Sequence, residues 1–265
     1  MFDISNCLYF NEKEIYEEMN RIATRIFSVY PFNNGSLALK QIIKNYAAAN
    51  NVQVKILYLP LKDIQLWGLF YQLDGIYFIV INSEISLNKQ VVALAHEFYH
   101  LYSTVEENMV ALDILADNVK TLNIEDKKAN AFAACFLMPE HFLKSMFKKP
   151  NTLEEKILLI KMVMDVFMVP FKTTVIRLME IDFLTKDEGL EIINSTTRNE
   201  RDKFESFNAF KLSKWDMVND KLLELDDLDT LFHINEELEL MSEKKLNKHK
   251  EIVEKITNLL KGNNS

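Results

Sequence analysis

Glycine and proline are rare in this chain, with five of each among 265 residues, against usual frequencies of about 7% and 5%. Their scarcity favours helices and disfavours collagen, flexible linkers and glycine-rich sandwiches. The glycines also lie too far apart for a dinucleotide-binding G-x-G-x-x-G, a Walker A loop or a G-x-S-x-G nucleophile elbow. These three classes of protein are therefore excluded.

The spacing of apolar residues predicts an α+β fold in which helices dominate. Residues 52–59, 66–73 and 75–82 are rich in β-branched and aromatic side chains, as strands are, and Asp74-Gly75 is a two-residue hairpin turn. Elsewhere apolar residues recur every three to four positions, which indicates helices. The predicted helices cover 12–29, 36–50, 88–102, 106–120, 125–137, 140–148, 153–168 and 171–183. We expect a mostly helical domain around a small three-stranded sheet.

The charge and the cysteine content favour a protein of the reducing cytoplasm. Two cysteines, Cys7 and Cys135, are too few for a disulfide framework and form no C-x-x-C pair. The sequence opens without a basic leader, and its apolar runs are far shorter than the roughly 20 residues that span a membrane. A net charge of −8 disfavours binding to nucleic acid. We predict a cytoplasmic protein that binds neither membrane nor nucleic acid.

The character of the chain changes near residue 185. Residues 1–185 hold the periodic segments and are predicted to form one compact domain, whereas 186–265 form a helical C-terminal appendage that is rich in charge. From Leu222 to Glu243 this appendage carries eight acidic residues and no lysine or arginine. Such a run is either a solvated helical face or a docking surface for a basic partner, and both interpretations stay open.

The segment VVALAHEFYHLY, residues 91–102, contains the motif H-E-x-x-H within a predicted helix. Because residues four apart lie on one helical face, His96 and His100 can offer imidazole nitrogens to one metal ion. Glu97 would deprotonate a water molecule that zinc activates, which is the chemistry of amide hydrolysis. The motif therefore predicts a zinc-dependent peptidase with Glu97 as its catalytic base.

Two other interpretations of this motif stay open. His96 and His100 could be ordinary helix residues with backbone or carboxylate partners, since a chance H-E-x-x-H is expected on the order of once in a hundred such sequences. The site could also bind a metal ion without catalysis, which the presence of Glu97 disfavours.

A catalytic zinc ion needs a third protein ligand, and no H-x-x-G-x-x-H extension follows His100. We therefore expect a carboxylate. The acidic candidates are Glu106, Glu107, Asp113, Asp117, Glu125 and Asp126. Asp126 lies one turn before Ala129 on the apolar face of the helix predicted from about 125, whereas Glu125 points about 100° away. Asp126 is the preferred ligand, with Glu125 as the alternative.

Other side chains could assist the chemistry. Asn130, one turn after Asp126, could hydrogen-bond the back nitrogen of a ligand histidine, although an ordinary helix asparagine fits the spacing equally well. A developing oxyanion needs a donor besides the metal, and Tyr99, Tyr102 and His141 are candidates that the sequence does not rank. Tyr99 could equally be a packed aromatic residue.

The order of motifs adds a resemblance to a known family. Ile81-Asn82 precedes the H-E-x-x-H helix, and DKKANAFAA, residues 126–134, and FLMP, residues 136–139, follow it. This order, after N-terminal helices and a short sheet, resembles the ImmA/IrrE family of metallo-endopeptidases over about residues 15–185. The resemblance implies a zincin-like domain with zinc ligands at His96, His100 and Asp126 and general base Glu97. It also implies that the substrate is a helix-turn-helix transcriptional repressor of a phage, a mobile element or a stress regulon.

Two segments leave alternatives for binding. The strand over 75–82 precedes the metal helix, and as a sheet edge it could bind an extended peptide by strand addition; the alternative is a core hairpin. Residues 169–184 could pass for a DNA-binding helix-turn-helix with Lys172 and Arg177 on phosphates, although their apolar residues suit a core better.

We predict a metallo-endopeptidase that holds one zinc ion, although manganese or iron would also suit a His/His/carboxylate site. The alternative is a catalytically silent protein on the same fold that binds a repressor or DNA. Such a protein would bind its partner without metal.

Overall fold

The computed structural model of the chain describes residues 4–30, 36–107, 112–116 and 123–195, together with Glu224, Asp226 and a few residues between Ser242 and Glu254. After a 3-10 helix over Ile4–Asn6, the helices are α1 (Leu8–Asn11), α2 (Lys13–Val29), α3 (Ser36–Ala49), α4 (Leu87–Glu107), α5 (Ile124–Leu137), α6 (Glu140–Met146), α7 (Leu153–Phe167), α8 (Phe171–Glu180) and α9 (Lys186–Ser195). The strands are β1 (Gln53–Leu59), β2 (Leu66–Leu73), β3 (Ile76–Asn82) and β4 (Leu112–Ala116). The predicted α+β class is confirmed.

The four strands form one mixed sheet in the order β1-β3-β2-β4. β1 pairs parallel to β3, and β2 pairs antiparallel to both β3 and β4. The hairpin between β2 and β3 turns at Asp74 and Gly75, whose φ angles are 50° and 79°. Positive φ at both central residues is what the favoured two-residue hairpin turn requires. The three predicted strands are therefore present, within one residue of the expected bounds.

Two predictions about the sheet are wrong. Within the helix predicted over 106–120, Leu112–Ala116 instead form β4, which pairs with β2, while residues 108–111 and 117–120 lie outside the described residues. A segment of five residues, four of them apolar, fits both the helical and the strand period, and pairing with a neighbouring strand decides between them. The strand over 75–82 is not an edge, because β3 lies between β1 and β2. Its backbone groups are used within the sheet, so β3 cannot bind a peptide by strand addition.

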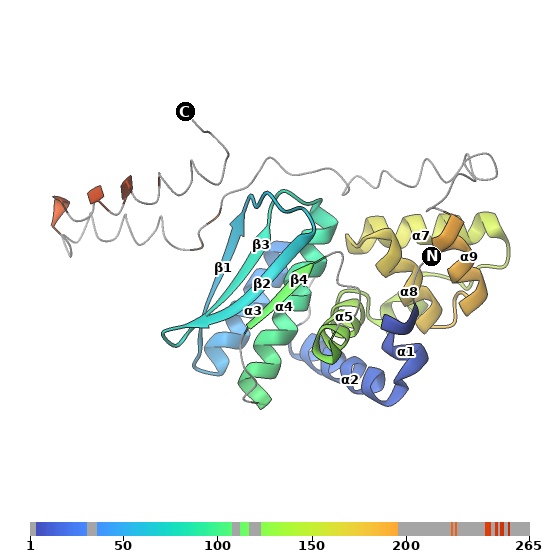
Figure 1. Cartoon of the computed structure of the whole chain (residues 1–265). Coiled ribbons are helices and arrows are strands. Elements are labelled where there is room, and N and C mark those ends of the chain that lie inside the picture. The colour runs from blue at the N-terminus through green and yellow to red at the C-terminus, as the bar shows by residue number, and fades with distance from the viewer. Residues whose placement is uncertain are drawn as a thin grey trace.

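The helix α4 lies at the centre of the molecule. With α3 it covers one face of the sheet, and its other side packs against α5 (Figure 1). Phe98 of α4 contacts both Phe132 and Phe136 of α5, with ring centroids 5.9 Å apart in each pair. Since both sides of α4 are covered, its polar motif residues are buried as well.

The helix α8 packs against α5, α7 and α9. Its Arg177 is completely buried, and the guanidinium donates to the carbonyl of Met138 at 3.0 Å, to the Tyr16 hydroxyl at 2.5 Å and to the Glu180 carboxylate at 3.0 Å. A side chain enclosed in this way cannot reach a DNA phosphate, so the helix-turn-helix interpretation of this segment is wrong for Arg177. The apolar residues of the segment serve the core, as their pattern favoured.

The predicted boundary at residue 185 falls between α8 and α9. Ile192 and Ile193 of α9 are buried in the same core as α8. The division into residues 1–185 and 186–265 stays a prediction, because most of the second region lies outside the described residues. Among the helices that are described, none combines the length and the hydropathy needed to cross a membrane.

Candidate metal centre

Two histidines of α4 face each other one turn apart. The Nε2 atoms of His96 and His100 are 3.0 Å apart, and both rings are buried. This arrangement follows from the i, i+4 spacing of the motif once the helix forms.

Asp126 reaches the same point from α5. This helix begins after Asn123, whose side chain accepts a hydrogen bond from the Asp126 backbone N–H at 2.7 Å. The cap places Asp126 in the first turn, where its Oδ1 lies 3.9 Å from Nε2 of His96. One ligand atom each from His96, His100 and Asp126 lies within 4.8 Å of the other two. The structure thus brings together the three residues that the sequence proposed as metal ligands.

The other acidic candidates either contact other residues or have side chains that the structure does not describe. Glu125 accepts hydrogen bonds from Lys128 at 2.8 Å and from the Tyr99 hydroxyl at 3.3 Å. Glu106 accepts a hydrogen bond from Tyr46. The side chains of Glu107, Asp113 and Asp117 are not among those that the structure describes. Of the two adjacent acids on α5, Asp126 rather than Glu125 joins the histidines.

Asn130 lies directly behind His96. Its side-chain oxygen is 3.0 Å from Nδ1 of the ring, which is the contact that the sequence spacing allowed. When the amide oxygen accepts, Nδ1 carries the proton, and the lone pair of Nε2 points toward His100 and Asp126. The asparagine therefore fixes both the tautomer and the orientation of His96.

His100 is held in its uncharged form. Burial lowers the pKa of its imidazole from 6.5 to about 4, so the ring carries no proton on its second nitrogen at neutral pH. Its face stacks on Phe70 of β2, with centroids 6.3 Å apart and planes inclined by 22°. A neutral imidazole is the form that binds a metal ion.

Glu97 lies against the backbone of β2. It is completely buried, and a β-carbon added to Gly68 would lie 2.4 Å from its Oε1 and 3.1 Å from its Cγ and Cδ. The absence of a side chain at Gly68 therefore makes room for the carboxylate. Gly68 was not among the predicted site residues, although a lone glycine inside an apolar strand is a signal of close approach.

A comparison with protein families matches residues 49–179 to peptidase family M78, described as the IrrE N-terminal-like domain. These residues belong to that family. The match spans β1 to α8 and contains the whole group of His96, Glu97, His100 and Asp126. It confirms the resemblance to ImmA/IrrE proteins and identifies a domain of metallopeptidase type. A comparison with curated proteins finds no match.

Tyr99 lies beside the residues His96, Glu97, His100 and Asp126 of this IrrE N-terminal-like domain, which are called the metal group below. Its ring meets that of His100 edge-on at a centroid distance of 5.7 Å, and only 1% of the residue is exposed. Its hydroxyl donates to Glu125 at 3.3 Å. Tyr99 thus packs as an aromatic wall beside a predicted ligand, and its role as an oxyanion donor stays a prediction.

The two other predicted oxyanion donors contact different parts of the domain. The Tyr102 hydroxyl accepts a hydrogen bond from Arg25 of α2. His141 is exposed on α6, and its ring contacts Phe27 and Phe142 at 5.9 and 4.5 Å. Neither contact points to catalysis, and both assignments stay predictions.

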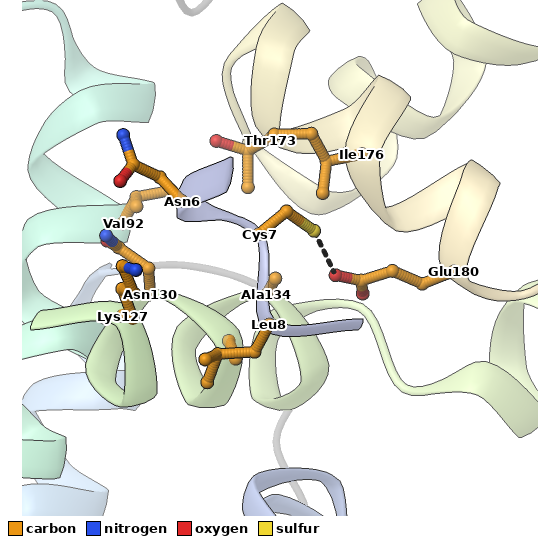
Figure 2. Close-up of a pocket in the computed structure, with 11 residues that line it drawn as sticks. Asn6, Cys7, Leu8, Val92, Lys127, Asn130, Ala134, Thr173, Ile176 and Glu180 are labelled. Carbon is orange, nitrogen blue, oxygen red and sulfur yellow. Dashed lines mark hydrogen bonds between the residues drawn. The ribbon is translucent and has the colours of Figure 1, made fainter. Parts of the chain in front are cut away.

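A cavity of about 220 Å³ is lined in part by Asn130, whose side-chain oxygen contacts His96. Figure 2 shows Asn130 and Val92 at one end of it, Glu180 at the other, and between them the Cys7 thiol, which is hydrogen-bonded to Glu180 at 3.8 Å. Burial and the nearby Glu180 carboxylate raise the pKa of Cys7 well above that of a free thiol. Cys7, which precedes the residues that match the family, is therefore held as a protonated thiol.

Proposed function

We propose that this protein is a zinc-dependent endopeptidase in which His96, His100 and Asp126 hold the metal ion and Glu97 is the catalytic base. The observation that supports the proposal most is the convergence of two imidazole nitrogens and one carboxylate oxygen within 4.8 Å in a buried position. This donor set suits zinc and leaves a fourth position for water or substrate. Manganese and iron also accept such ligands.

Each residue of the group has a distinct task in this mechanism. When bound, zinc supplies a Lewis acid that polarises the peptide carbonyl and makes water more acidic. The Glu97 carboxylate accepts the proton of the attacking water and returns it to the leaving amide nitrogen. Asn130 holds His96 in the ligating tautomer, and Gly68 leaves the space in which Glu97 is oriented.

The substrate that we propose is a helix-turn-helix transcriptional repressor, which the resemblance to ImmA/IrrE proteins supports. An extended segment of such a substrate could pair with a free strand edge. Because β3 is internal, we propose the outer edge of β4 for this task. β4 pairs with β2, which carries Gly68 and Phe70 against the metal group.

Elemental analysis of the purified protein tests the metal site. We expect about one zinc ion per chain in the wild type, and loss of zinc in His96→Ala and Asp126→Ala. Glu125→Ala is the matched control, since it removes the adjacent carboxylate that contacts Lys128 instead. Circular dichroism checks that each variant is folded. A folded wild type that takes up no metal, even when zinc is supplied, would refute the proposal.

A search for new protein N-termini tests the hydrolysis. Wild type and Glu97→Gln are incubated with an extract of the source cells, and new N-termini are identified by mass spectrometry. We expect cleavage of a helix-turn-helix repressor by the wild type alone, while Glu97→Gln retains its metal. Equal cleavage by both proteins would exclude Glu97 as the base. Metal binding without any cleavage would favour the silent repressor-binding protein.

A further inference from the structure

The strand β1 forms one edge of the sheet (Figure 1). An edge strand presents backbone N–H and C=O groups that can pair with another segment, so proteins cover or protect such edges. Here Tyr58 pairs antiparallel with Glu224. The Tyr58 N–H donates to the Glu224 carbonyl at 2.8 Å, and the Glu224 N–H donates to the Tyr58 carbonyl at 3.0 Å. A residue from the C-terminal region thus lies on the edge of the peptidase domain.

Two lysines of α3 hold the acidic side chains of this segment. Lys40 Nζ is 2.5 Å from the Glu224 carboxylate, and Lys44 forms an ion pair with Asp226. Asp226 also accepts a hydrogen bond from the backbone N–H of Ile56 at 3.3 Å. Asp226 has 7% of its side chain exposed, so this carboxylate is well covered.

The contacting residues are spaced two apart both on β1 and on the segment that holds Glu224 and Asp226. Ile56 and Tyr58 are two residues apart, so both direct their N–H groups to the same side of β1, as alternate residues of a strand do. Glu224 and Asp226 are also two apart. The backbone carbonyl of Glu224 accepts from the Tyr58 N–H, and the side-chain carboxylate of Asp226 accepts from the Ile56 N–H. The lysines are four apart, which places them on one face of α3.

Lys40 is also held in place by a contact with Tyr58 of β1. The Lys40 ammonium lies over the ring of Tyr58, 4.1 Å from its centroid, and the Lys40 side chain is only 15% exposed. A cation over an aromatic face is stabilised there, so Lys40 is kept at the edge by its own domain. Two residues of the acidic run, Glu224 and Asp226, thus contact basic residues of the same chain.

We propose that the β1 edge together with Lys40 and Lys44, here named the acidic-strand dock, is a binding site for a segment that pairs with Tyr58 at one acidic residue and places a second acidic residue, two positions later, in a turn. Its occupant is the chain's own segment around Glu224 and Asp226. The dock anchors the C-terminal region to the peptidase domain. Within the described residues the dock lies apart from the metal group, because β3 separates β1 from the strand that contacts Glu97.

Hydrogen exchange on the full chain tests the dock. We expect the amide of Tyr58 to exchange at least tenfold faster in Lys40→Glu/Lys44→Glu and in Glu224→Lys/Asp226→Lys than in wild type. The variant with all four changes restores opposite charges, and its protection should return toward that of wild type. Lys148→Glu/Lys149→Glu, which changes two exposed lysines, is the charge-matched control and should leave Tyr58 unchanged.

A second measurement uses a synthetic peptide of residues 219–230 with a fluorescent label. In wild type the peptide competes with a tethered segment at an effective concentration that is about millimolar for a short linker. We therefore expect it to bind Glu224→Lys/Asp226→Lys at least tenfold more tightly than wild type. Lys40→Glu/Lys44→Glu should not bind it. A peptide with both acids changed to lysine is the matched control.

Three results would overturn the dock. One is unchanged exchange at Tyr58 in both double variants. Another is failure of the fourfold variant to regain protection while circular dichroism shows it folded. The third is peptide binding that is indifferent to the two lysines. Asp226→Asn keeps an oxygen for the Ile56 N–H and removes only the charge, so its intermediate protection would assign the effect to the ion pair with Lys44.

Discussion

Gly68 of β2 and Glu97 of α4 are in direct contact, and a β-carbon at position 68 would lie 2.4 Å from the glutamate Oε1. This relation joins the sheet to the proposed catalytic base. A carboxylate that accepts a proton at one place needs a fixed position. The backbone of β2 at Gly68 forms one side of the space that holds the Glu97 carboxylate.

The first prediction concerns this wall. Gly68→Ala should displace the Glu97 carboxylate and lower peptide cleavage about a hundredfold or more, since positioned acid and base groups contribute about 10²- to 10⁴-fold. Metal content should stay at the wild-type level, because the three atoms nearest to the new methyl group all belong to Glu97 and none belongs to a predicted metal ligand. Gln72→Ala, at an exposed position of the same strand, is the control. Full activity in Gly68→Ala would show that Glu97 is free to adopt another position.

The second prediction concerns Asn130. Asn130→Ala removes the acceptor for Nδ1 of His96, and we expect zinc affinity to fall about 10- to 100-fold, as for other groups that orient a ligand. Titration against a chelator of known affinity measures this change. Asn130→Asp keeps an oxygen acceptor and should lose less. If both variants bind zinc as tightly as wild type, Asn130 does not orient the ligand.

The third prediction concerns the buried pair of Arg177 and Glu180. Glu180→Ala leaves the guanidinium buried without its carboxylate, which should lower the free energy of unfolding by about 3–5 kcal/mol. The double variant Arg177→Met/Glu180→Leu removes both charges and should be much closer to wild type. Urea denaturation measures all three proteins. A double variant as unstable as the single one would mean that the bonds of Arg177 to Met138 and Tyr16 matter more than its charge.

The metal group could be predicted because it rests on local rules. Four-residue spacing within one helix brings His96 and His100 together, and the apolar face of the next helix selects Asp126 over Glu125. Asn123 as an N-cap then fixes where that helix begins. Each step depends on residues that are near in sequence, where periodicity is informative.

The features that escaped prediction depend on distant partners. The run Leu112–Ala116 becomes a strand only because β2 offers an edge. Arg177 is buried because Tyr16, far away in sequence, and Glu180 meet it inside the core. The contact of Gly68 with Glu97 needs the packing of β2 on α4. Apart from Glu180, which lies three residues after Arg177 on the same helix, these partners cannot be identified from local spacing or composition.

The last prediction concerns the pH dependence of stability through Glu188. Lys156 of α7 donates to its carboxylate at 2.7 Å, and the Thr185 N–H donates at 2.8 Å, which together lower the pKa of Glu188 from 4.5 to about 2. The folded state therefore holds this proton less tightly than the unfolded chain. The resulting stability is present above pH 4.5 and is lost as the pH falls toward 2.

Glu188→Gln keeps an oxygen for Thr185 but removes the charge. At neutral pH it should lower the free energy of unfolding by at most about 1 kcal/mol, because the pair is partly exposed and screened by solvent. The difference from wild type should shrink below pH 4.5 and vanish near pH 2. Lys156→Met should show the same pH dependence, since it removes the partner that contributes most to the shift. Urea denaturation at several pH values measures both variants, and a difference that grows on acidification would contradict the assigned sign.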